Sequence, residues 1–136
     1  MSRVRKAALW TLWIAGAFIV LAAIVVFYAM AFVSGFWLRT NDQSALKAIK
    51  AESQILMASQ PTKTKDYSDV PKSRWPPTIA SLKPAWVTVY PGHGVQIQTT
   101  PFFDGGWGYF VPQGEQKSPG PECSDIGQGV YWCHPY

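Results

Sequence analysis

Charge is scarce in this sequence, and the scarcity is local. Charged residues make up 15% of the 136 residues, against about 25% in an ordinary soluble domain. Between Lys6 and Arg39 the chain runs for 32 residues without any charge, whereas a membrane-spanning helix needs only about 20 apolar residues. This excludes a plain soluble enzyme and a multidomain protein. It indicates one small domain attached to a membrane anchor.

Sequence signatures of catalysis are also lacking. No GxSxG motif, P-loop or dinucleotide-binding glycine motif is present. The two cysteines are too far apart for a CxxC redox motif, and no His or Cys pair has the spacing of a zinc site. His93 lies between two glycines and His134 lies next to Pro135, where we expect both rings to be solvated. We therefore predict a protein that is not an enzyme and has no cofactor and no metal.

The basic excess does not indicate a nucleic-acid partner. The net charge is +4, but residues 39–83 alone carry eight basic and four acidic groups, whereas residues 84–136 carry one basic and four acidic groups. A nucleic-acid-binding face needs its basic residues gathered on the folded part of the chain. The part predicted to fold is acidic, so we expect no nucleic-acid binding.

Residues 7–38 are predicted to form a single transmembrane helix, preceded by a cytoplasmic tail over residues 1–6. Tryptophans near both ends of the apolar run suit the two membrane interfaces. A cleaved signal peptide is the alternative, although its apolar region would be about 22 residues against the usual 7–15. The flanking charges are nearly balanced, so the cysteines decide the orientation, since a disulfide needs an oxidising compartment. We expect a bacterial inner-membrane protein with its N-terminus in the cytoplasm and residues 39–136 in the periplasm.

Small residues recur every seven positions along the predicted span. Side chains at this spacing share one helix face and allow another helix to approach closely within lipid. The alternative is that alanine is simply common in membrane helices. The predicted packing face consists of Ala8, Ala15, Ala22 and Ala29.

Residues 39–74 are predicted to form a helical stalk and a linker. Thr40 and Gln43 have the spacing of a capping box, and apolar residues at helical spacing follow over 42–58. The stripe that should pack on a sheet consists of Leu46, Ile49, Ser53 and Leu56. Proline-rich residues 60–77 read as an extended linker, and Pro77 suits the first position of a short helix over 78–82.

Residues 75–136 are predicted to form a small antiparallel head. Alternating apolar and polar residues predict four strands, over 85–90, 95–99, 107–111 and 129–134, with residues 112–128 as a surface loop. A disulfide between Cys123 and Cys133 would contribute roughly 2–3 kcal/mol to the stability of so small a head. The predicted fold class is α+β: a single N-terminal transmembrane helix, a helical stalk and a four-stranded β-meander head with one disulfide.

Aromatic residues gather around a glycine-rich turn in the head. Such residues, flanked by glycine, are common in recognition surfaces, and they also stack on sugar rings. The alternative is that these large rings fill the core of the head. The candidate binding surface consists of Phe102, Phe103, Asp104, Trp107, Tyr109, Trp86 and Trp132.

The anchor, stalk and disulfide-tied sheet resemble the outline of type IV pilins. The acidic residue of the pilin leader has no counterpart, because the span carries no acidic residue, and no family is assigned. We expect a non-enzymatic accessory protein of the inner membrane whose head binds another membrane or periplasmic protein. The alternatives are a membrane-anchored module that binds cell-wall glycan and a tethered inhibitor or immunity protein.

Overall fold

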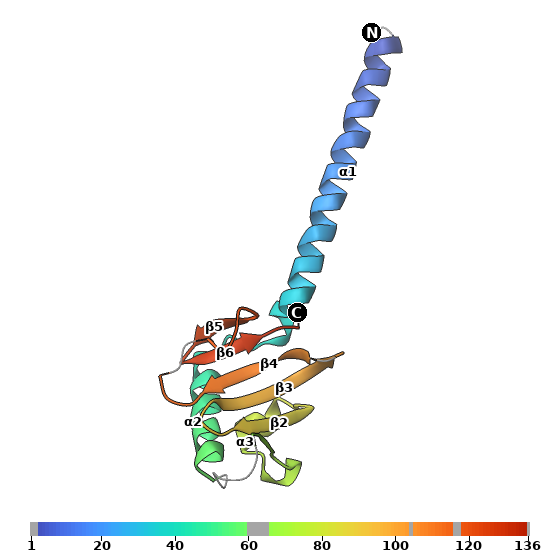
Figure 1. Ribbon diagram of the computed structural model, residues 1–136. Helices are drawn as coiled ribbons and strands as arrows, with labels where there is room; N and C mark the ends of the chain where they lie inside the picture. Colours follow the sequence, from blue (N-terminus) through green and yellow to red (C-terminus); the bar gives the residue numbers. More distant parts are fainter. Residues whose placement is uncertain (1–2, 60–65, 104, 116–117, 136) are drawn as a thin grey trace. The chain divides into compact units, whose positions relative to one another are not determined.

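The computed structural model describes residues 3–59, 66–103, 105–115 and 118–135, and the chain divides into two units at Trp37. The first unit contains helix α1 (Arg3–Ser34), and a 3-10 turn, η1 (Phe36–Leu38), follows it. The second unit, from Leu38 onward, contains both the predicted stalk helix and the predicted head, and the whole unit is called the head below. It is α+β, with helices α2 (Gln43–Ser59) and α3 (Pro77–Ser81), a 3-10 turn η2 (Lys72–Arg74) and a six-stranded sheet (Figure 1).

The sheet of the head is antiparallel throughout, and its strand order is β1-β2-β3-β4-β6-β5. The four predicted strands are confirmed as β2, β3, β4 and β6. The predicted strand number and simple meander are wrong, because two further strands lie at the two edges and β6 lies between β4 and β5. The strands are β1 (Ser68–Asp69), β2 (Trp86–Tyr90), β3 (Gly94–Phe102), β4 (Gly105–Pro112), β5 (Cys123–Gly127) and β6 (Val130–Cys133).

Both additional strands form in segments without an alternating pattern. Strand β1 has two residues and lies within the predicted linker, where the Val70 N–H donates to the Val87 carbonyl at 2.8 Å. Strand β5 lies within the predicted loop, and Cys123 is directly opposite Cys133 of β6. These two cysteines form the predicted disulfide. Pairing with a neighbouring strand and a cross-strand disulfide therefore fix these segments, rather than their own residue pattern.

Helix α1 is apolar and long enough to cross a membrane, and among the described residues it is the one helix that meets this test. Its 29 residues from Lys6 to Ser34 span about 44 Å at 1.5 Å per residue. The helix ends at Ser34 rather than at the predicted Leu38. Gly35 follows with φ 60°, and its N–H donates to the Phe32 carbonyl at 3.1 Å. A glycine in the left-handed region is a common helix terminator.

Helix α2 confirms the helix predicted over 42–58, although its cap differs. The Asp42 carboxylate accepts hydrogen bonds from the Ser44 N–H at 2.9 Å and the Ser44 hydroxyl at 2.8 Å. These bonds hold the pKa of Asp42 below its usual value. The predicted capping box of Thr40 and Gln43 is wrong, because Asp42 lies closer to the first turn and the Gln43 amide donates instead to the Ile126 carbonyl at 3.3 Å.

The core of the head lies between α2 and one face of the sheet (Figure 1). The predicted stripe of α2 is confirmed, because its four residues are the buried residues of that helix. Helix α3 begins at Pro77, one residue earlier than predicted. The Glu52 carboxylate of α2 accepts the N–H groups of Thr78 and Ile79, each at 2.9 Å. This carboxylate joins the two helices and satisfies two of the N–H groups that a helix start leaves unpaired.

Candidate binding site on the open face of the sheet

Three of the predicted surface aromatics are buried. Trp107, Tyr109 and Trp132 belong to the hydrophobic core, where the rings of Tyr109 and Trp132 lie 4.9 Å apart between centroids. The Tyr109 hydroxyl accepts the Thr40 N–H at 2.8 Å. Burial raises the pKa of Tyr109, although its bond to Thr40 and the charge of Arg39 oppose the shift. A binding surface built on these three rings is therefore wrong, and the alternative that they fill the core holds.

The remaining predicted surface residues do not form one patch with them. Trp86, Phe102 and Phe103 are exposed, and Asp104 lies outside the described residues. Phe102 and Phe103 lie at the tip of the β3–β4 hairpin, whereas Trp86 begins β2. The structure thus divides these aromatic residues between the core and the surface, and the Phe102 ring contacts that of Trp107.

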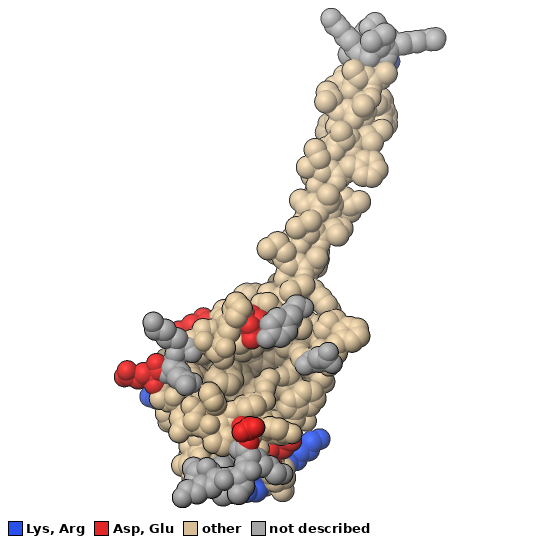
Figure 2. Space-filling model, viewed as in Figure 1, with Lys and Arg blue, Asp and Glu red and all other residues tan. Residues whose placement is uncertain are grey.

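A different site lies on the sheet face opposite α2. Gln98 of β3, Gly108 of β4 and Cys133 of β6 are paired side by side across three adjacent strands. Gly106 and Gly108 carry no side chain, so this face has a hollow of about 330 Å³. Figure 2 shows the head hollowed on the face toward the viewer, with few charged side chains at the centre.

The glycines of β4 are required by the close packing beneath the hollow. A Cβ atom on Gly106 would collide with the Thr100 carbonyl and the Gln98 side-chain nitrogen, and a Cβ atom on Gly108 would collide with the Ile97 carbonyl. Glycine at these two positions therefore allows the Gln98 amide to lie flat over β4. The same absence of side chains keeps the hollow open.

A chain of hydrogen bonds runs from β2 along β3 and ends at Gln98, which lines the hollow. The Tyr90 hydroxyl donates to Gln96 Oε1 at 3.1 Å, and Gln96 Nε2 donates to Gln98 Oε1 at 3.0 Å. Gln98 is 2% exposed, and its Nε2 has no hydrogen-bond partner among the described residues. A buried donor without a partner costs about 1–3 kcal/mol. Because this nitrogen is itself buried, an acceptor oxygen recovers this free energy only if the neighbouring groups move to expose it.

Aromatic, proline and acidic residues line the rest of the hollow. Phe110 and Tyr90 contribute rings, and the residues that line the other side are Pro119, Glu122, the two disulfide cysteines, His134 and Pro135. No Lys or Arg of the described residues lines it. Burial raises the pKa of Tyr90, and the charges of Asp69 and Tyr67 raise this pKa further. Tyr90 is therefore a neutral hydrogen-bond donor near pH 7. The arrangement suits a neutral ligand with an acceptor oxygen and an apolar or ring-shaped face.

The part of the chain that the structure describes holds no cluster of metal-binding side chains. Within the described ranges no three His, Cys, Asp or Glu side chains lie close enough to hold a metal ion. His93 is exposed in the turn between β2 and β3. The ring of His134 lies with Nδ1 2.8 Å from the Pro135 carbonyl. That the protein is not an enzyme stays a prediction.

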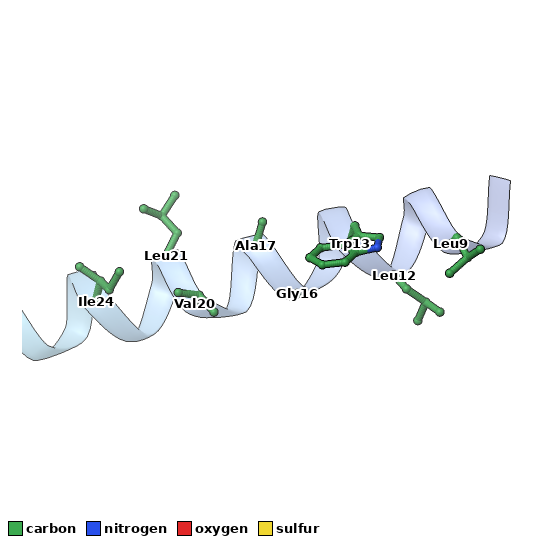
Figure 3. A pocket seen from close by; sticks show the side chains of 8 residues that line it. All are labelled: Leu9, Leu12, Trp13, Gly16, Ala17, Val20, Leu21 and Ile24. Carbon is green, nitrogen blue, oxygen red and sulfur yellow. The ribbon is translucent and has the colours of Figure 1, made fainter. Parts of the chain in front are cut away.

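The predicted alanine face of α1 also stays a prediction. Ala8, Ala15, Ala22 and Ala29 are exposed or nearly so. A separate notch lies over Gly16 and Ala17, which carry little or no side chain between larger neighbours (Figure 3). Gly16 is displaced by about 100° around the helix from Ala15, so the notch and the alanine face are different stripes. The notch is the surface of a single helix and encloses no ligand site.

The hollow was not predicted from the sequence. A signal was present in strand β4, where glycines at 106 and 108 alternate with the aromatics at 107 and 109. Period-two alternation places the glycines on one face and the rings on the other. Comparison with protein-family models, curated proteins and solved structures finds no match to this chain, so its function is inferred from the site alone.

Proposed function

We propose that this protein is a non-enzymatic binding module of the bacterial inner membrane, anchored by α1, with its N-terminus in the cytoplasm and its head in the periplasm. The length and apolar character of α1 support the anchor. The Cys123–Cys133 disulfide supports an oxidising compartment for the head. The ligand that the site fits best is a sugar unit of the cell-wall glycan.

The Gln98 side-chain nitrogen, which has no hydrogen-bond partner among the described residues, is the observation that carries this proposal. A sugar offers hydroxyl or carbonyl oxygens to this donor, and it offers hydroxyl protons to Glu122 at the side. Its ring has an apolar face that packs on Phe110 or Tyr90. The absence of Lys and Arg among the described lining residues disfavours an anionic ligand.

Affinity measurements on two matched variants test the binding role. Gln98→Met keeps the length of the side chain but removes its donor and the oxygen that accepts from Gln96, and Gln54→Met makes the same change on the exposed side of α2. Binding of the N-acetylglucosamine disaccharide, a neutral sugar, to the full chain in nanodiscs should weaken about tenfold in Gln98→Met, since a hydrogen bond contributes about 1–1.5 kcal/mol. Gln54→Met should bind as the parent does. Equal affinity for both variants, or no binding by the parent, contradicts the glycan proposal.

A second candidate function rests on α1. Its alanine face, exposed in a helix that can span a membrane, supports an accessory protein that packs against another membrane helix. Ala15→Leu and Ala22→Leu should release a co-purifying membrane partner in mild detergent, whereas Ala17→Leu, about 200° around the helix from Ala15, should not. A parent protein that runs as a monomer without a partner contradicts this role.

A further inference from the structure

The tip of the β3–β4 hairpin carries the most exposed large apolar side chain among the described residues of the head. Phe103 is 93% exposed and Phe102 is 40% exposed. Their ring centroids lie 4.7 Å apart, and the Phe102 ring lies 5.4 Å from that of Trp107 in the core. One ring thus rests on the core and supports the other, which projects into the surroundings.

The turn itself does not explain a phenylalanine at this position. Phe102 pairs with Gly105, so the hairpin loop has two residues, Phe103 and Asp104. Phe103 has φ 48°, in the left-handed region that Asn and Gly adopt most readily in such loops. A bulky residue there is an outlier, and strain of this kind tends to mark functional positions. The exposed ring therefore has a use outside the turn.

The chain also limits how far the head can lie from a membrane spanned by α1. The Thr40 N–H is bonded to Tyr109 of β4, the strand that begins at the hairpin tip. Six residue steps separate Thr40 from Ser34, the last residue of α1, which is at most about 22 Å of extended chain. This limit holds for every orientation of the two units. The tip, six residues along the chain from Tyr109, is thus within reach of the bilayer surface.

We infer that Phe102 and Phe103 insert into the interface of the bilayer leaflet from which α1 emerges. This inference rests on the proposed anchoring by α1. Aromatic rings are favoured at the boundary between headgroups and acyl chains. The head is then held to the membrane at two points, by its chain connection and by this tip.

Fluorine NMR of the full chain in phosphatidylcholine nanodiscs tests this contact. A p-trifluoromethylphenylalanine label is placed in turn at Phe103, at Phe18 in α1 and at Ile55 on α2, whose side chain is 64% exposed. Ile55 is the matched control, because it is apolar and exposed but lies away from the hairpin. A nitroxide carried on the lipid acyl chain should broaden the signals from positions 18 and 103 and leave that from position 55 sharp. A water-soluble gadolinium chelate should broaden the signal from position 55.

The three labels separate failure of this inference from failure of the anchor. If the position 18 signal is broadened by the lipid nitroxide and the position 103 signal is not, α1 is anchored and the inference is wrong. If the position 18 signal is not broadened, the proposed anchor fails and the inference fails with it. A label at Phe102 repeats the measurement one residue before the strained turn position, so an effect of the label on the turn does not decide the result.

Discussion

The carboxylate of Glu52 should be among the most costly side chains to change in the head, because it joins two helices. It accepts the N–H groups of Thr78 and Ile79 at 2.9 Å each. Glu52→Gln keeps one acceptor oxygen but turns an NH₂ group toward the other N–H, so one of the two bonds is lost. A hydrogen bond to a charged group contributes about 1.5–3 kcal/mol, and a negative charge at a helix start adds about 0.3–1 kcal/mol. Since Glu52 is only partly buried, we expect Glu52→Gln to lower the free energy of unfolding by about 2 kcal/mol.

Urea unfolding of the head measures this loss. Full-length protein in detergent micelles is followed by the fluorescence of the core tryptophans Trp107 and Trp132, and the free energy of unfolding is obtained by linear extrapolation. Glu115→Gln is the matched control, because Glu115 is exposed in the segment after β4. If Glu52→Gln and Glu115→Gln have equal stabilities, the bonds between α2 and α3 do not contribute as described.

Two further predictions concern buried polar groups. The hydroxyl of Ser53 is buried on α2 without a partner among the described residues, so Ser53→Ala should raise the free energy of unfolding by about 1 kcal/mol in the same assay; a decrease would show that the hydroxyl is bonded. Burial raises the pKa of Tyr109 above its ordinary value near 10, so the folded head favours the neutral phenol. The resulting stability is present below pH 10 and is lost as the pH rises through the folded-state pKa. The urea concentration at the midpoint of unfolding should therefore fall less steeply with pH, between pH 8 and 11, in Tyr109→Phe than in the parent. Identical pH dependence in the two proteins would contradict a buried phenol.

The parts of the fold that the sequence predicted are those in which periodicity reports burial. The stripe from Leu46 to Leu56 has helical spacing, and the valines of β2 and β3 alternate with polar residues, so each pattern identified its element and its buried face. The disulfide followed from the presence of only two cysteines. The edge strands β1 and β5 were missed because pairing with a neighbour, rather than a pattern of their own, holds them in place.

The site was harder to predict because it depends on strand register. The hollow exists because Gln98 is opposite Gly108, and Gly108 is opposite Cys133. A shift of one residue would put a tyrosine or tryptophan ring of β4 on this face instead. Local sequence does not reveal the pairing between strands. Nor does it reveal that Gln98 uses its oxygen within the sheet and leaves its nitrogen without a partner.

The side-chain amide of Gln98 provides the most direct test of a binding role for the head. Its NH₂ protons are observable by ¹⁵N-resolved NMR of the full chain in nanodiscs, and the side-chain signals of exposed Gln54 serve as an internal control. Saturating N-acetylglucosamine disaccharide should shift the Gln98 signals and slow their exchange with water, because the nitrogen gains an acceptor, and should leave those of Gln54 unchanged. Gln98 signals that stay in place at saturation would contradict a ligand site in the hollow.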